Sequence, residues 1–142
     1  MADERGAIDA AILESIAGRY RTDEHVKQVR LTLGDVEGRQ RLTITLDPDR
    51  YPDHVLKARI EVQWYRNDGF NAYYVETHAE GGTWQCRWDR QRNLHNEREH
   101  FHPPPDATDA VDTEYPEDYR DVLSAVRIVI RNRIAALWER HP

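Results

Sequence analysis

Three histidines and an arginine–aspartate pair gather in one polar stretch, residues 87–105. An imidazole titrates near neutral pH and can transfer protons, and an arginine can stabilise the negative charge that develops on phosphorus. Asp89 is placed to orient a histidine or the arginine. Because RNA supplies its own 2′-hydroxyl as nucleophile, these groups predict metal-independent acid–base cleavage of a phosphodiester. The predicted catalytic residues are Arg87, Asp89, His100 and His102.

The same histidines allow two other interpretations. If residues 98–102 are extended, His100 and His102 project to one side, and His95, Asp89 or Glu99 can complete a set of metal ligands. The spacing matches no established metal motif, so we favour a site without a metal or another cofactor. In the third interpretation the histidines are ordinary polar residues of a loop.

Alternation of apolar and polar residues over residues 26–88 predicts an antiparallel sheet of about five strands. The clearest strand is 55–66, where Ile60 and Val62 point to one face and the charged residues between them to the other. In residues 83–88, Cys86 lies on the predicted buried face. The sheet is therefore expected to have one apolar face and one polar face.

Helical spacing of apolar residues predicts two helices, at residues 7–18 and 116–139. Pro116 suits the first position of the second helix. That helix carries an apolar stripe wide enough to cover a sheet. We therefore predict an α+β fold in a single domain spanning residues 1–142, with the C-terminal helix packed on one sheet face.

A long loop is predicted for residues 89–115, first rich in histidine and then acidic and punctuated by proline. The uncovered polar face would present arginine and tyrosine side chains beside this loop. Tyr73 could stack on a base. The alternating charges of this face are equally consistent with a solvated surface. The predicted substrate-binding residues are Arg59, Tyr65, Tyr73 and His95.

Composition excludes several classes of protein. The formal net charge is −6, and no Lys/Arg cluster marks a nucleic-acid-binding tail. No apolar run is long enough to span a membrane, and residues 1–18 lack the layout of a secretory signal. The single cysteine cannot form an internal disulfide, so we expect a cytoplasmic protein.

The segments CRWDRQRNLHNEREHFHPPPDA and DVLSAVRIVIRNRIAALW resemble the TumE-like proteins, toxin components of toxin–antitoxin pairs in bacteria and archaea. The resemblance covers residues 55–139. It implies a cytoplasmic α+β protein, a cognate antitoxin as partner and an activity directed at RNA. The family's arginine and aspartate fall on Arg87 and Asp89, and its histidines on His95 and His102.

Two departures from the family pattern leave an alternative open. Family members often carry adjacent histidines, which Asn96 and Phe101 interrupt here, and residues 1–54 have no counterpart. The leading hypothesis is an RNA-cleaving toxin. The alternative is a non-enzymatic module that binds protein or nucleic acid through the polar sheet face and the histidine loop. A homodimer through exposed strand residues such as Val75 is a further expectation.

Overall fold

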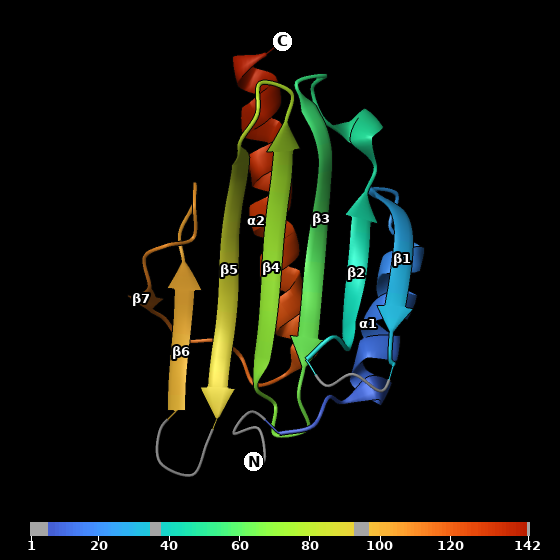
Figure 1. Ribbon diagram of the computed structural model, residues 1–142, viewed down its shortest axis with the longest axis vertical. Coiled ribbons are helices and arrows are strands. Elements are labelled where there is room, and N and C mark those ends of the chain that lie inside the picture. The colour runs from blue at the N-terminus through green and yellow to red at the C-terminus, as the bar shows by residue number, and fades with distance from the viewer. Residues whose placement is uncertain (1–5, 35–37, 93–96, 142) are drawn as a thin grey trace.

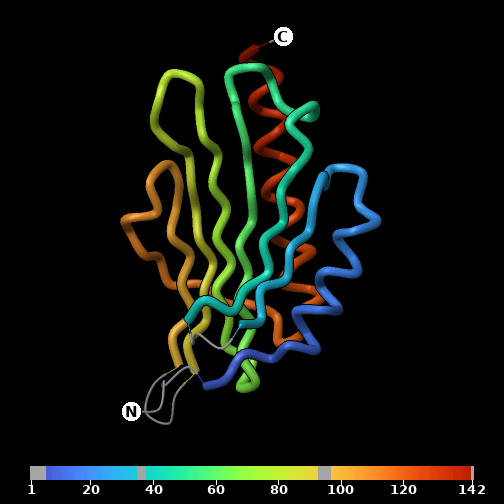
Figure 2. Tube along the Cα trace, turned by 45° about the vertical axis from the view of Figure 1, so that its right-hand side comes forward, coloured from blue at the N-terminus to red at the C-terminus, as the bar shows by residue number. Residues whose placement is uncertain are grey.

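A computed structural model describes residues 6–34, 38–92 and 97–141. Within these residues, seven strands form one sheet in the order of the chain, and each strand is antiparallel to its neighbours (Figure 1). The elements are α1 (Ala10–Arg21), β1 (Val26–Thr32), β2 (Arg41–Leu46), η1 (Pro48–Arg50), β3 (Val55–Trp64), β4 (Phe70–His78), β5 (Thr83–Arg92), β6 (Glu97–His102), β7 (Val111–Asp112) and α2 (Tyr119–Arg140). The chain thus crosses the sheet as a meander from the β1 edge to the β7 edge (Figure 2).

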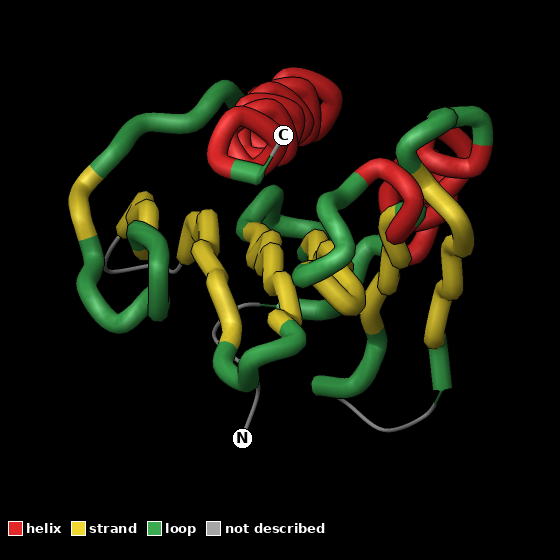
Figure 3. The backbone as a smooth tube through the Cα atoms, turned by 90° about the horizontal axis from the view of Figure 1, so that it is seen from above, coloured by secondary structure: helices red, strands yellow, loops and turns green. Residues whose placement is uncertain are grey.

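Both helices lie on the same face of the sheet (Figure 3). The core forms between the helices and the sheet, where Ile60, Val62 and Trp64 of β3 are almost completely buried. From α2, Val122 and Val126 join the same cluster. The predicted α+β class and the covering of one face are therefore confirmed, and no helix of the described residues lies on the opposite face of the sheet (Figure 3). No helix in the described part of the chain has the length and hydropathy needed to cross a membrane.

Each helix begins three residues later than the sequence predicts, and the reason is tertiary. The segment before α1 extends the sheet, since Ile8 bridges Tyr65 and the Asp9 amide donates to the Trp64 carbonyl (2.8 Å). Asp9 then caps the helix by accepting from the Ile12 amide (3.1 Å). Helix α1 also continues past Gly18, the predicted stop, and ends at Arg21.

The start of α2 is displaced by a buried arginine. Arg90, only 1% exposed, donates to the carbonyl oxygens of Asp68 (2.9 Å), Pro116 (2.7 Å) and Glu117 (3.3 Å). These bonds hold residues 116 and 117 outside the helix, and Asp118 becomes the cap. The proline therefore precedes the helix instead of occupying its first turn.

The prediction of a loop over residues 89–115 is wrong for much of that range. Strand β5 continues to Arg92, Glu97–His102 forms β6, and Val111–Asp112 forms β7, so the sheet has seven strands and not about five. These strands lack the apolar alternation that marks the others. In β5 the buried position 90 is an arginine, and β6 is almost wholly charged or imidazole-bearing.

Val75, expected to be exposed, is only 4% exposed although it lies on the face without helices. The chain after β6 runs beside this part of β5, where the amide of Gln85, which pairs with Val75, donates to the Pro105 carbonyl (2.8 Å). Val75 therefore offers no surface for a homodimer.

Candidate functional site

The four predicted catalytic residues lie on two neighbouring strands of the open face, the sheet face without helices. The register of β5 and β6 places Arg87 opposite His102 and Asp89 opposite His100. Since side chains alternate along a strand, residues two apart share a face, and all four point away from the helices. A loop was expected to bring these groups together, but a strand pair does so.

The closest contact in this group joins Asp89 and His102. The Nε2 atom of His102 lies 2.8 Å from the Oδ2 atom of Asp89. A carboxylate accepts hydrogen bonds only, so Nε2 carries the proton and donates it to Asp89. In the neutral imidazole, Nδ1 then keeps its lone pair and can act as a base.

Arg87 packs against the same imidazole. Its Nη2 atom lies 3.2 Å from Nε2 and 3.5 Å from Nδ1 of His102, which places it beside the carbon between the two nitrogens. Its Nε atom lies 3.5 Å from the Asp89 carboxylate, close enough for an ion pair. The guanidinium therefore supplies positive charge beside the imidazole, and its contact with Nδ1 is the longer of the two.

His100 completes the group from the outer side of Asp89. Its Nδ1 atom lies 3.8 Å from the second carboxylate oxygen of Asp89, and its Nε2 atom lies 3.3 Å from the exposed carboxylate of Asp112. The rings of His100 and His102 stand edge to face at 6.2 Å. Two imidazoles thus share one carboxylate, and together they can accept one proton and donate another.

The same groups are of the kind that hold a divalent metal. Within the described residues, ligand atoms of Asp89, His100 and His102 all lie within 4.8 Å of one another. Imidazole and carboxylate suit zinc and similar ions. The Arg87 guanidinium, 3.2 Å from His102 Nε2, opposes a second positive charge at this position. His95, which the metal hypothesis also used, lies outside the described residues.

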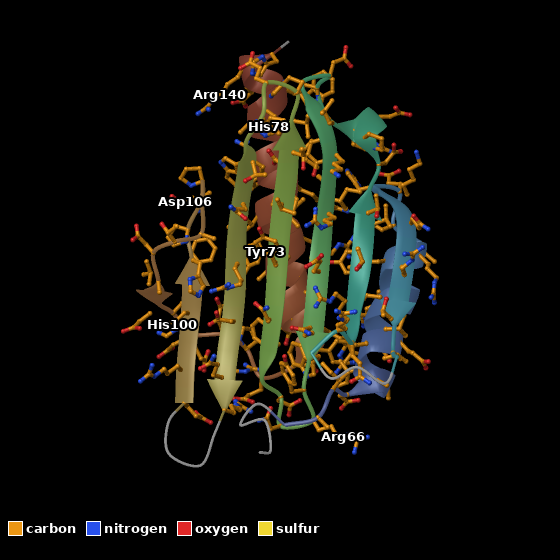
Figure 4. The ribbon with its side chains drawn as sticks, viewed as in Figure 1. Arg66, Tyr73, His78, His100, Asp106 and Arg140 are labelled. Carbon is orange, nitrogen blue, oxygen red and sulfur yellow. The ribbon has the colours of Figure 1, made fainter. Side chains whose placement is uncertain are left out.

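Tyr73 lies beside the catalytic group, on β4 opposite Arg87. Its hydroxyl donates to the side chain of Gln85, and burial raises the pKa of the phenol. Tyr73 lines a cavity of about 280 Å³ (Figure 4 labels Tyr73, Asp106 and His100). The other lining residues are Arg41, Glu61, Gln63, Asn71, Gln85, Arg87, Asp106 and Ala107.

Two of the other predicted substrate-binding residues, Arg59 and Tyr65, do not line this cavity. Arg59 is half-buried on β3 and pairs with Glu61 (3.2 Å). Tyr65 is only 5% exposed, and its hydroxyl reaches the Gln63 side chain at 3.4 Å. The structure therefore brings Tyr73 to the catalytic group but leaves Arg59 and Tyr65 apart from it. His95 cannot be placed because it lies outside the described residues.

A second polar cluster, absent from the sequence predictions, lies on the helix-covered face. The fully buried carboxylate of Glu76 accepts two hydrogen bonds from Arg133 (2.9 and 2.8 Å). It also lies 2.7 Å from the Tyr74 hydroxyl and 2.9 Å from His78 Nε2. Burial acts to raise the pKa of Glu76, but these bonds outweigh it and hold the pKa below its usual range.

This second cluster, the Glu76 cluster, borders a cavity of about 540 Å³ at the end of α2. His78 and Arg140 line it (Figure 4). The signal in the sequence was a glutamate at a position of β4 that alternates with apolar residues on the buried face. Such a residue needs a partner when buried, but its partner Arg133 is 57 positions away along the chain.

Comparison with known proteins adds one finding. The family model described as "Toxin TumE" matches residues 14–134, which is most of the chain. The match begins well before residue 55, so it includes most of α1 and the first strands, for which the sequence resemblance offered no counterpart. Searches of the curated proteins and of the solved structures find no match.

Proposed function

We propose, on the premise that this chain belongs to the TumE toxin family, that it cleaves RNA by acid–base chemistry that needs no metal. The observation that carries the proposal is the 2.8 Å contact between Asp89 and His102, with the Arg87 guanidinium against the same imidazole. A base, its orienting carboxylate and a cation thus lie together on one sheet face. These are the groups that cleavage by an internal 2′-hydroxyl requires.

In the proposed reaction, His102 Nδ1 takes the proton from the ribose 2′-hydroxyl. Asp89 holds the opposite nitrogen and stabilises the imidazolium that forms, because the carboxylate lies 2.8 Å away. The 2′-oxygen then attacks phosphorus, and a P–O2′ bond forms as the P–O5′ bond breaks. Arg87 stabilises the additional negative charge on the phosphoryl oxygens.

His100 supplies the second proton. In its protonated form it donates to the departing 5′-oxygen, and its two ring nitrogens face the carboxylates of Asp89 and Asp112. The products are a 2′,3′-cyclic phosphate and a 5′-hydroxyl, and water is not consumed in this step. The two histidines end with exchanged protonation states, which bulk solvent restores.

The partner of the protein is a cognate antitoxin, as membership of the toxin family implies. The protein would act in the cytoplasm, where RNA is present. An antitoxin that covers the open face would block access to His102. The alternative function, binding of protein or nucleic acid without cleavage, would use the same face. The two functions differ in whether the bound RNA is broken.

A direct test expresses the wild type and the His100→Ala/His102→Ala double variant in a sensitive host, and incubates each purified protein with RNA. We expect the wild type to arrest growth and to leave 2′,3′-cyclic phosphate ends, and the double variant to do neither. A chelator should leave wild-type cleavage unchanged. Loss of cleavage in chelator, restored by zinc or manganese, would replace this mechanism with a metal-dependent one.

Equal growth of cells expressing the two proteins, with intact RNA in both, would remove the proposed ribonuclease function. If both proteins still bound RNA with the same affinity, the non-enzymatic alternative would take its place. Circular dichroism of the double variant serves as the control for folding.

A further inference from the structure

The cavity beside the catalytic group contains buried polar atoms that the protein itself leaves unsatisfied. Within the described residues, the Oδ1 atom of Asn71 and the Nε atom of Arg87 are buried without a hydrogen-bond partner. Both residues line the cavity of about 280 Å³. Buried polar atoms are almost always hydrogen-bonded, so two exceptions at one cavity call for an explanation. A ligand that offers a hydrogen-bond donor would satisfy Asn71, and an anion would complement Arg87, whose Nε atom has only the 3.5 Å ion pair with Asp89.

The register of the sheet ties this cavity to the catalytic group. Asn71 pairs with Asp89, and Tyr73 pairs with Arg87, across β4 and β5. Directly opposite residues of an antiparallel pair have Cβ atoms about 5 Å apart. Arg87 both lines the cavity and contacts His102. A molecule in the cavity therefore lies next to the groups proposed to cleave RNA.

The lining of the cavity combines side-chain amides and a phenol with four charged side chains. Arg41 and Glu61 form an ion pair at 3.4 Å. Asp106 accepts from the amide and hydroxyl of Thr108. Side-chain amides present a donor and an acceptor in one plane, the pattern by which Asn and Gln recognise the edge of a base. The amides come from Gln63, Asn71 and Gln85, and the phenol is that of Tyr73. Gln63 donates to the Gln40 carbonyl and Gln85 accepts from Tyr73, so Asn71 is the amide whose oxygen is left for a ligand.

A segment after β6 closes one side of the cavity. Asp106 and Ala107 belong to its lining. The backbone there is held to β5, since the Gln85 amide donates to the Pro105 carbonyl (2.8 Å) and Asp106 bridges Gln85. Ala107 has a φ of 59°, a left-handed conformation that is uncommon for a residue with a Cβ. The cavity wall is thus built by specific contacts.

We propose that this cavity is a nucleobase pocket. A base there donates an N–H to Asn71 Oδ1 and packs beside Tyr73, while the phosphate of the same nucleotide lies against Arg87. The inference rests on the proposed function, because it makes the bound nucleotide the one whose phosphodiester is cleaved. A nucleotide fits better than an acidic peptide, since it combines a planar polar group with an anion over the short distance between Asn71 and Arg87.

Binding of small probes to the full chain tests the pocket. The probes are the four ribonucleoside 3′-monophosphates and inorganic phosphate, titrated by calorimetry or NMR. We expect the affinity of the wild type for at least one nucleotide to exceed its affinity for inorganic phosphate by about tenfold or more. The Asn71→Leu variant should lose most of that difference and keep its affinity for phosphate. The Gln91→Leu variant is the matched control, because Gln91 is exposed on the same strand face as Arg87 but lies outside the cavity.

Thermal unfolding separates a binding role of Asn71 from a structural one. Because its Oδ1 atom has no partner in the free protein, the Tm of Asn71→Leu should equal or exceed that of wild type. Asn71→Ala is the second variant, in case leucine is too large for the site. A fall in Tm with unchanged nucleotide binding, in either variant, would make Asn71 a structural residue and overturn the pocket.

Cleavage of an oligoribonucleotide in which a single abasic ribose replaces one nucleotide distinguishes the two proposals. If wild type cleaves at the abasic position as fast as at the parent nucleotide, the base pocket is wrong and the ribonuclease function stands. If wild type cleaves no RNA but binds nucleotides through Asn71, the ribonuclease function is wrong and the pocket stands. Loss of antitoxin binding, but not of nucleotide binding, in Asn71→Leu would assign the cavity to a protein contact instead.

Discussion

The protein contains two groups of the same composition on opposite faces of one sheet. On the open face, Asp89 contacts His102 and Arg87. On the helix-covered face, Glu76 contacts His78 and Arg133. Each group has a carboxylate, an imidazole bonded through Nε2 and a guanidinium. Residue types alone therefore cannot tell which of the two is a site of chemistry.

The two groups differ in how completely their hydrogen-bonding capacity is used. Glu76 is fully buried and accepts bonds from Arg133, Tyr74 and His78, so both of its oxygens are satisfied. Arg133 also stacks on Trp84 at 3.9 Å, which uses its planar face. In the open-face group, Arg87 Nε makes no hydrogen bond within the described residues. A saturated network stabilises a fold, whereas an unsaturated one is available to a ligand.

The largest expected effect concerns the two histidines. His102→Ala should reduce RNA cleavage by about 10²–10⁴-fold, the usual loss when a general base is removed. The matched variant is His78→Ala, which removes the corresponding imidazole from the Glu76 cluster and should leave the rate within about threefold of wild type. Initial rates on one oligoribonucleotide measure both. A larger loss in His78→Ala than in His102→Ala would reverse the assignment of the two groups.

When stability is measured in place of activity, the larger loss should come from the Glu76 cluster and the smaller from the open-face group. Glu76→Ala leaves Arg133, whose side chain is only 12% exposed, without its partner and should lower the free energy of unfolding by about 3–5 kcal/mol. Asp89→Ala should lower it by about 1–2 kcal/mol, because the group around it is nearer to solvent. Urea unfolding followed by tryptophan fluorescence gives both values. Equal losses in the two variants would contradict the distinction drawn between the clusters.

The pH dependence of stability sharpens the same comparison. The pKa of Glu76 is held below its ordinary value of 4.5 in the folded protein, where burial is outweighed by bonds from Arg133, His78 and Tyr74. The folded state therefore gains stability from this group above about pH 4.5, and that gain is lost as the pH falls through the folded pKa. The stability difference between wild type and Glu76→Gln should shrink from pH 7 to pH 3. A difference that stays constant over this range would show that Glu76 does not titrate with a lowered pKa.

The smallest expected effect tests the far end of the Glu76 cluster. The hydroxyls of Tyr51 and Tyr74 lie 2.7 Å apart, and Tyr74 in turn donates to Glu76. Tyr51→Phe removes one buried hydrogen bond and should lower the free energy of unfolding by about 1 kcal/mol. RNA cleavage should not change. A loss of activity larger than the loss of folded protein would connect this cluster to the chemistry.

Sequence reasoning succeeded where one local pattern sufficed. The apolar alternation in β3 and the apolar stripe of α2 predict a half-buried sheet covered by a helix, and both are confirmed. It failed at β6, where Glu97 and Glu99 share the helix-facing side of the strand with Phe101, so that side lacks an apolar alternation. It also missed the Glu76 cluster, because Glu76 and Arg133 meet only when α2 packs on the sheet.

The sequence by itself thus determined the α+β class, the buried face and the four residues expected to do chemistry, because side-chain period and residue type are local properties. Only the tertiary structure decided that Asp89 bonds His102 and that His100 lies beside them, because the register of β5 and β6 sets those distances. It alone also placed Asn71 and Arg87 at one cavity, since strands β4 and β5 must pair before the two side chains become neighbours.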